Sequence, residues 1–170
     1  MDSQLSRLTA ALPAPQPAHR FDWAEAETRC GTSLPADYKN LLDAYGPVGF
    51  DDFLWLLFPG DHKFLSLSDE GGRIVGEYLP AMDPTIDVDR YQAWGITDNG
   101  DYCLWEKTTP NPDDWTVTLT DTGLNRWDRF PDLNVTGFLL RLVERTLESS
   151  VMPLADIDLP PTPSVAPVHT

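Results

Sequence analysis

Three histidines, two cysteines and many carboxylates are the side chains in this chain that could carry out chemistry. Cys30 and Cys103 lie far apart and outside any metal-ligand spacing, so they do not form a zinc motif. His19 lies beside a proline-rich stretch, His62 in a predicted turn and His169 in a polar, proline-rich tail. The sequence has no G-x-S-x-G motif, no G-x-G-x-x-G motif and no phosphate-binding loop. We therefore expect no catalytic residue, no cofactor and no metal ion.

The carboxylates are explained as turn and surface residues. Asp83, Asp87 and Asp89 are spaced like weak calcium ligands, but the glycine and final glutamate of an EF-hand loop are absent. Asp113 and Asp114 follow a Pro-Asn-Pro sequence, which is typical of a turn. Some pair of carboxylates could in principle carry out acid–base chemistry, but turn formation explains these residues without it.

The balance of charge restricts the possible partners. The chain has 170 residues, with 12 basic and 27 acidic side chains and a formal net charge of −15. Nucleic acids and anionic membranes attract positive charge, so we do not expect direct binding to either. A basic protein is a natural partner, because complementary potentials speed and orient association. The alternative is that the acidic excess only keeps the protein in solution.

The cysteines and the apolar segments indicate a compartment. Two isolated cysteines without a disulfide framework indicate a reducing environment and buried thiols. No basic stretch followed by an apolar one marks a secretion signal near residue 1. The longest apolar run, residues 53–58, is too short to span a bilayer. We therefore expect a cytoplasmic protein.

Local signals predict four helices and divide the chain into three parts. We expect helices over residues 2–12, 22–30, 35–45 and 135–148, because each has apolar residues recurring along one face or residues that favour helix ends. Residues 68–79 form a weaker helix prediction, since three glycines interrupt them. The predicted parts are an N-terminal helix and proline-rich spacer (1–20), an α+β domain (21–150) and a disordered proline-rich tail (151–170).

Short aromatic and β-branched runs predict the strands. Residues 50–58 are expected to form one buried strand, and residues 91–96, 102–106, 115–119 and 126–130 an antiparallel meander. Asn99-Gly100 predicts a type I′ hairpin turn, in which both central residues have positive φ. The predicted fold class is α+β, with a single mostly antiparallel sheet and helices packed on one face.

Several motifs in order resemble the SUKH superfamily, which joins bacterial immunity proteins with a yeast regulator of cell-wall synthesis. The first is Leu34-Pro-x-Asp-Tyr-x-x-Leu-Leu-x-x-Tyr-Gly, and the second is Trp94-Gly-x-Thr-x-x-Gly-Asp. Leu104-Trp, Trp127 and Phe138-Leu follow, so the resemblance covers about residues 21–147. The residues that we take as determinants of this fold are Leu34, Pro35, Tyr38, Tyr45, Gly46, Trp94, Gly95, Gly100, Asp101 and Trp105.

The resemblance implies a protein-binding domain without catalysis. Bacterial members of the superfamily are similar to antidotes that bind a cognate toxin, often a nuclease or a nucleic-acid deaminase, inside the producing cell. An acidic surface could occupy the basic cleft of such a toxin. The alternative is a scaffold or regulatory adaptor without a toxin, and an enzyme of unknown type is a third reading. The candidate partner-binding residues, all in predicted loops or strand edges, are Asp51, Asp52, Asp83, Asp87, Asp89, Asp113 and Asp114.

Overall fold

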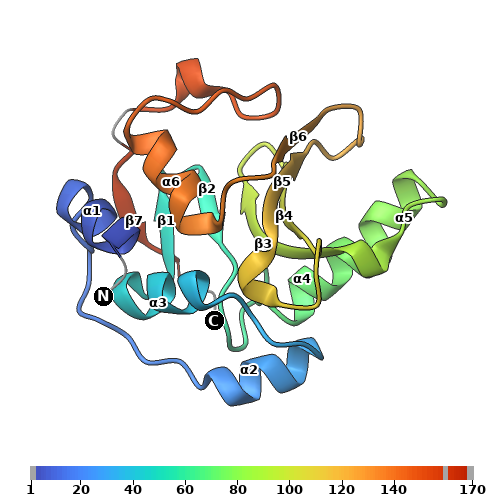
Figure 1. Cartoon of the computed structure of the whole chain (residues 1–170), viewed down its shortest axis with the longest axis horizontal. Coiled ribbons are helices and arrows are strands. Elements are labelled where there is room, and N and C mark those ends of the chain that lie inside the picture. The colour runs from blue at the N-terminus through green and yellow to red at the C-terminus, as the bar shows by residue number, and fades with distance from the viewer. Residues whose placement is uncertain (1–2, 159–160, 168–170) are drawn as a thin grey trace.

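A computed structural model describes residues 3–158 and 161–167 of the chain. In these residues one antiparallel sheet has the strand order β6-β5-β4-β3-β2-β1-β7 (Figure 1). This confirms the predicted α+β class with a single antiparallel sheet. The strands are β1 (Val48–Phe50), β2 (Leu54–Leu56), β3 (Tyr91–Thr97), β4 (Tyr102–Glu106), β5 (Thr116–Thr120), β6 (Trp127–Phe130) and β7 (Pro163–Val165).

The helices lie on both sides of the sheet (Figure 1). None of those in the described residues is long and apolar enough to cross a membrane. The α-helices are α1 (Ser3–Ala11), α2 (Trp23–Cys30), α3 (Ala36–Tyr45), α4 (Asp69–Arg73), α5 (Leu79–Met82) and α6 (Val135–Val143). A π-helical turn, η1 (Ile74–Tyr78), joins α4 to α5, and the 3₁₀ turns are η2 (Val88–Arg90), η3 (Pro112–Asp114) and η4 (Leu154–Asp156).

Local capping sets the ends of the helices. The Asp22 side chain accepts the N–H of Glu25 at the start of α2, and Gly31 ends that helix with φ 72°. Asn134 caps α6 in the same way, since its side chain accepts the N–H of Gly137. However, α6 ends at Val143, five residues earlier than the predicted end at 148. The reason is a Schellman motif at the end of the helix. Arg145 adopts φ 60°, and the N–H of Thr146 donates to the carbonyl of Arg141.

The predicted strand over residues 50–58 is wrong, because a tight turn divides it into β1 and β2. Asp51 and Asp52 have φ values of 57° and 46°, and the Phe53 N–H donates to the Phe50 carbonyl at 3.1 Å. Aspartate tolerates this left-handed conformation better than most residues. The turn therefore forms without the glycine or proline that would have marked it in the sequence.

The predicted hairpin at Asn99-Gly100 is present, but its turn type differs from type I′. Asn99 does not have a positive φ, whereas Gly100 has φ 85°. The Gly100 N–H donates to the Thr97 carbonyl, and the Thr97 N–H donates to the Asp101 carbonyl. This pattern is a type I turn closed by a glycine bulge. The buried Asp101 carboxylate accepts the Thr97 hydroxyl at 2.8 Å and ties the two strands together.

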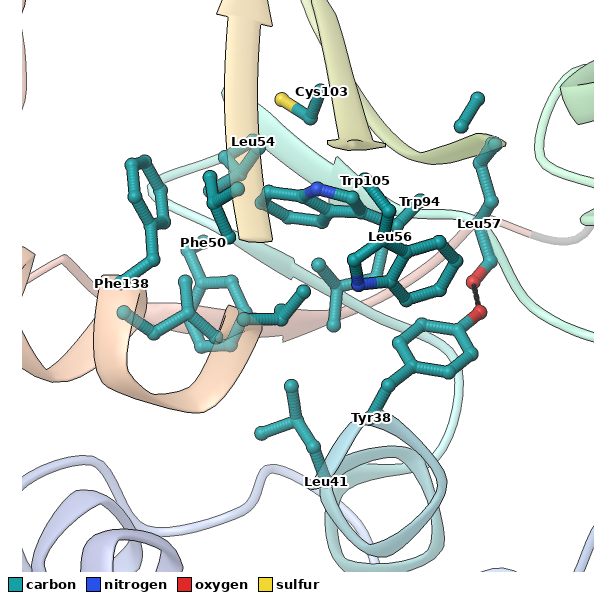
Figure 2. Close-up of a cluster of buried hydrophobic side chains, with 14 of the residues drawn as sticks. Tyr38, Leu41, Phe50, Leu54, Leu56, Leu57, Trp94, Cys103, Trp105 and Phe138 are labelled. Atoms are coloured by element: carbon teal, nitrogen blue, oxygen red, sulfur yellow. Dashed lines mark hydrogen bonds between the residues drawn. The ribbon is translucent and has the colours of Figure 1, made fainter. Parts of the chain in front are cut away.

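Two buried tryptophans join the sheet to the helices above it. Trp94 packs edge-on against Phe138 of α6, with ring centroids 5.7 Å apart. Trp105 packs edge-on against Tyr38 of α3 at 4.9 Å (Figure 2). The Tyr38 hydroxyl then donates a hydrogen bond to the carbonyl of Leu57. Tyr38 of the first motif and Trp94 of the second thus lie in the same hydrophobic core.

The segment from α4 to α5 lies against the opposite face of the sheet. Ala93 and Leu104 are paired across β3 and β4, and their side chains point away from Trp105 because neighbours along a strand alternate. A Cβ placed on Gly71 of α4 would lie 3.9 Å from the Cβ of Ala93. Helices therefore contact both faces, whereas the sequence predicted that all would pack on one.

Pro80 accounts for the π-helical turn in this segment. A proline inside a helix donates no N–H, and its ring clashes with the carbonyl four residues earlier, here that of Gly76. The helix widens over η1, where the Leu79 N–H reaches back to the Ile74 carbonyl. The helix predicted over residues 68–79 is therefore present, but it is widened by η1 and extends to Met82.

Residues outside the predicted 21–150 domain also belong to the fold. Leu5, Leu8 and Leu12 are buried in the same core as the sheet. The predicted disordered tail is wrong for the described part, because β7 pairs with β1 and Met152 and Ile157 are buried. Residue 2 of the first predicted helix and tail residues 159–160 and 168–170 lie outside the described residues.

Removal of the Tyr38 hydroxyl tests the link between α3 and the sheet. Tyr38→Phe leaves the buried Leu57 carbonyl without its donor, so we expect the free energy of unfolding to fall by about 1–3 kcal/mol. The exposed Tyr78→Phe is the matched control, with an expected change within about 0.5 kcal/mol. Urea unfolding at 25 °C measures both, and equal midpoints for the two variants would contradict the role of the hydroxyl.

A pair of glycine substitutions tests the tight packing of β3. A Cβ at Gly95 would lie 3.1 Å from the Trp55 carbonyl oxygen and 3.3 Å from the Cβ of Cys103. Gly95→Ala should therefore destabilise the protein by about 1–3 kcal/mol. Gly72→Ala, in α4, meets nothing within 4 Å and should stabilise it by about 0.4–1 kcal/mol. Thermal unfolding that moved both midpoints in the same direction would rule out this difference.

Candidate functional site

The seven candidate aspartates lie in separate places. Asp51 and Asp52 form the β1–β2 turn, which lies beside the β3–β4 turn because Leu54 pairs with Thr97. The start of β3 and the end of β4 lie at the opposite end of the sheet, since Tyr91 pairs with Glu106. Asp83, Asp87 and Asp89 lie on the segment that connects α5 to β3, and Asp113 and Asp114 lie in η3, between β4 and β5. The seven therefore do not form one continuous face.

Several of these aspartates have local structural roles. Asp113 accepts the N–H of Ala36 at 2.8 Å and so satisfies a free donor at the start of α3. Asp114 accepts bonds from Asn111 and Thr109 within its own loop. The loop explains this pair without a partner, as the sequence indicated.

The β1–β2 turn gathers carboxylates from distant segments. Asp51 accepts the N–H of Asp158 at 3.0 Å, and Asp52 accepts the hydroxyl of Ser164 at 2.8 Å. Asp98, from the neighbouring β3–β4 turn, accepts the indole N–H of Trp55. None of these carboxylates forms an ion pair within residues 3–158 and 161–167. The turn is therefore an acidic surface.

The projecting end of the α4–α5 segment combines apolar and acidic residues, and we call residues 77–83 the α5 tip (Figure 1). Residues 78–82 are all apolar or aromatic, yet only Leu79 is buried. Tyr78 is 37% exposed and Met82 is 54% exposed. Sequence reasoning missed this surface, because a run such as Tyr-Leu-Pro-Ala-Met is more often part of a core.

Acidic side chains lie on the α5 tip and in the segment that follows it. Glu77 and Asp83 belong to the tip itself, and Asp87 and Asp89 follow on the way to β3. The hydroxyl and N–H of Thr85 bond to Asp83, which lowers the pKa of that carboxyl. In the described part of the chain these four carboxylates form no ion pair. The tip therefore presents apolar side chains within a negative field.

Glu106 lies in a satisfied ion cluster at the end of β4. Its carboxylate accepts Arg129 at 2.8 Å and Thr118 at 3.3 Å and is also bonded to Arg90. Burial alone would raise the pKa of Glu106, but the hydrogen bonds and charges of the two arginines outweigh it and lower this pKa. Arg129 also donates to the Tyr91 hydroxyl. The cluster joins β3, β4, β5 and β6 and has no acid poised near neutrality.

Burial accounts for the two thiols, and hydrogen bonds account for His62. Burial raises the pKa of the Cys30 thiol and raises the pKa of Cys103 far more, so both thiols stay protonated and unreactive at neutral pH. The His62 ring accepts the N–H groups of Phe64 and Leu65, and its other nitrogen lies 2.8 Å from the Pro167 carbonyl oxygen. His169 lies outside the described residues, so its prediction is not tested.

The cavities and carboxylates of the described residues do not indicate a particular reaction. A cleft of about 320 Å³ lies between α2, α4 and β3, with Arg29, Gln92 and Lys107 among its lining residues. Its size is at the lower end of ligand pockets. Within the described residues, no group of three His, Cys, Asp or Glu side chains is placed to hold a metal ion, including Asp83, Asp87 and Asp89.

Comparisons with protein-family models, with curated proteins and with solved structures found no match for this chain. The resemblance to the SUKH superfamily therefore stays a prediction from its motifs.

Acid titration tests the Glu106 cluster. The pKa of Glu106 is lower in the folded state, so its contribution to stability is present above its unfolded pKa and is lost as pH falls through the folded value. Glu106→Gln should lower the free energy of unfolding by about 1–3 kcal/mol at pH 7. The difference from the wild-type chain should be smaller at about pH 3 than at pH 7, because the unfolded chain takes up a proton at Glu106 before the folded chain does.

The control for this titration is Glu70→Gln, which removes a surface pair with Arg73. It should change stability by no more than about 1 kcal/mol at either pH. A Glu106→Gln effect that is the same at pH 7 and pH 3 would show that the charge of Glu106 does not stabilise the fold.

Proposed function

We propose that the chain is a non-catalytic protein-binding domain, an immunity protein that neutralises a basic toxin domain of nuclease or deaminase type by binding it in the cytoplasm. The observation that carries this proposal is the α5 tip, where apolar side chains are exposed and carboxylates lie on the same segment and directly after it. The motif resemblance supports the class of partner, since members of that superfamily are similar to toxin antidotes.

The apolar part of the tip supplies affinity. Tyrosine and methionine are enriched at protein interfaces, where they bury a large area at low entropic cost or adapt to an irregular surface. Tyr78 and Met82 are four residues apart, so they lie on one side of the helical segment. A partner with an apolar depression would take up these two side chains together. A few such residues commonly carry most of the binding energy.

The acidic part of the tip supplies speed and selectivity. Nucleases and nucleic-acid deaminases need positive charge to hold phosphate. Glu77, Asp87 and Asp89 are exposed and can face such a basic surface without breaking an ion pair in the described chain. Opposite potentials raise the association rate and make it sensitive to salt. Occupation of the cleft by the tip would exclude the nucleic acid.

Capture from a host lysate with matched variants tests this function. The tagged full-length chain is incubated at low salt and eluted as the salt concentration rises. We expect one basic protein to be recovered stoichiometrically by the wild-type chain and by the control Phe64→Ser, whose side chain is also exposed. Tyr78→Ser combined with Met82→Ser should lose that protein. The purified partner should cleave or deaminate nucleic acid, and the wild-type chain should inhibit it.

Other outcomes would contradict parts of the proposal. Recovery of the same protein by the wild-type chain and by both variants would show that the tip is not the binding surface. Several host proteins without nuclease or deaminase activity would instead favour the scaffold or adaptor function. With a purified partner, Asp87→Lys combined with Asp89→Lys should slow association and weaken its salt dependence. An unchanged association rate would show that these two carboxylates do not steer the partner.

A further inference from the structure

The edge of β1 is covered by the chain's own segment 161–167. β7 pairs antiparallel with β1, with Gly49 opposite Ser164 (Figure 1). The Ala166 N–H donates to the Pro47 carbonyl at 3.0 Å, and the Asp51 N–H donates to the Thr162 carbonyl at 2.8 Å. Backbone hydrogen bonds thus run along the whole contact.

Apolar side chains contribute little to this contact. Val165 is 47% exposed, and Pro163 and Ser164 are only partly buried. The buried residues of the segment are Pro161 and the small Ala166, which is 4% exposed. Because buried apolar area sets the hydrophobic contribution, β7 is held mainly by its backbone bonds. Within segment 161–167, Ala166 is the one member of the hydrophobic core, so the segment can leave with little loss of buried apolar area.

β1 remains in place when β7 leaves. Its Val48 and Phe50 side chains are at most 1% exposed, and it also pairs with β2. The alternation of an antiparallel ladder directs the backbone groups of Gly49 toward β7. Departure of β7 would therefore expose Gly49, the Pro47 carbonyl and the Asp51 N–H along one straight edge. Such an edge can take up an extended strand from another chain.

β7 itself closes the sheet to further strands. Pro163 lies opposite Phe50, one residue away from the hydrogen-bonded pair of Gly49 and Ser164. An N–H at this position would point outward, and proline has none. An incoming strand that replaces β7 therefore gains a more complete ladder than one that adds to β7.

The surroundings of this edge specify the chemistry of the incoming strand. The Ser164 hydroxyl donates to the Asp52 carboxylate at 2.8 Å, and Asp51 is the neighbour of Asp52 in the β1–β2 turn. A lysine or arginine at the position of Ser164 would meet this negative surface. We propose that the β1 edge is a strand-addition site for an extended, basic segment of a protein partner, and that β7 occupies this site in the free chain.

A peptide-binding experiment on the full-length chain tests this site separately from the α5 tip. Ser164→Pro removes an N–H that the ladder needs, and Ala166→Glu places a charge at a buried position, so the double variant should release β7. The probe is a fluorescein-labelled synthetic peptide with the sequence of residues 161–167 and lysine in place of Ser164. The matched control peptide carries an N-methyl group on the backbone nitrogen of that lysine.

We expect the double variant to bind the probe at least about tenfold more tightly than the wild-type chain, whose attached segment competes at high effective concentration. The N-methyl peptide should bind at least about tenfold more weakly, since it lacks one ladder donor. Adding Asp52→Asn to the double variant should weaken binding and its dependence on salt.

The proposal is overturned if the double variant, with an unchanged circular dichroism spectrum, fails to bind the probe at about 1 mM. It is also overturned if the N-methyl peptide or a peptide that keeps Ser164 binds equally well. If the double variant unfolds, Ala166→Glu alone is tested against the same peptides, with the same criteria.

Discussion

Burial of Trp94 and Trp105 between the sheet and its helices is the interaction on which the rest of the structure depends. Both side chains are fully buried, and neither indole N–H has a hydrogen-bond partner in the described residues. An unsatisfied donor costs about 1–3 kcal/mol, so the area and shape of the rings must outweigh that cost. Tyr38 and Phe138 pack edge-on against the two indoles and thereby fix α3 and α6. Packing in the core thus accounts for Tyr38 of the first motif and Trp94 of the second.

The surfaces that can bind a partner lie outside this core. The α5 tip projects from a helix that Pro80 widens, and its exposed Tyr78 and Met82 contribute little to the fold. The β1–β2 turn holds Asp51 and Asp52 in a left-handed conformation beside a lightly anchored edge strand. Such positions can change to suit a partner without disturbing the packing. Acidic surfaces at these two places are compatible with the proposed binding of a basic protein.

The sequence predicted features whose causes are local. Caps at Asp22 and Asn134 and the glycine at 100 act within a few residues, so helix starts and the β3–β4 hairpin could be derived. The Asp51–Asp52 turn lacked a glycine, and the pairing of β7 with β1 joins residues more than 100 positions apart, so neither had a local signal. For the candidate site, the sequence predicted only that its surface would be acidic. Its division among separate loops and the exposure of the tip follow from long-range packing.

Residue-resolved amide hydrogen exchange of the free full-length chain tests the central claim of a rigid core with a lightly held edge most directly. The amides of β3, β4 and β5 should exchange only through global unfolding, because the tryptophan core surrounds them. The amides of Gly49 and Asp51, which face β7, should exchange faster through local opening. Protection of these two amides equal to that of β4 would contradict the account, since β7 would then be as firmly held as the core.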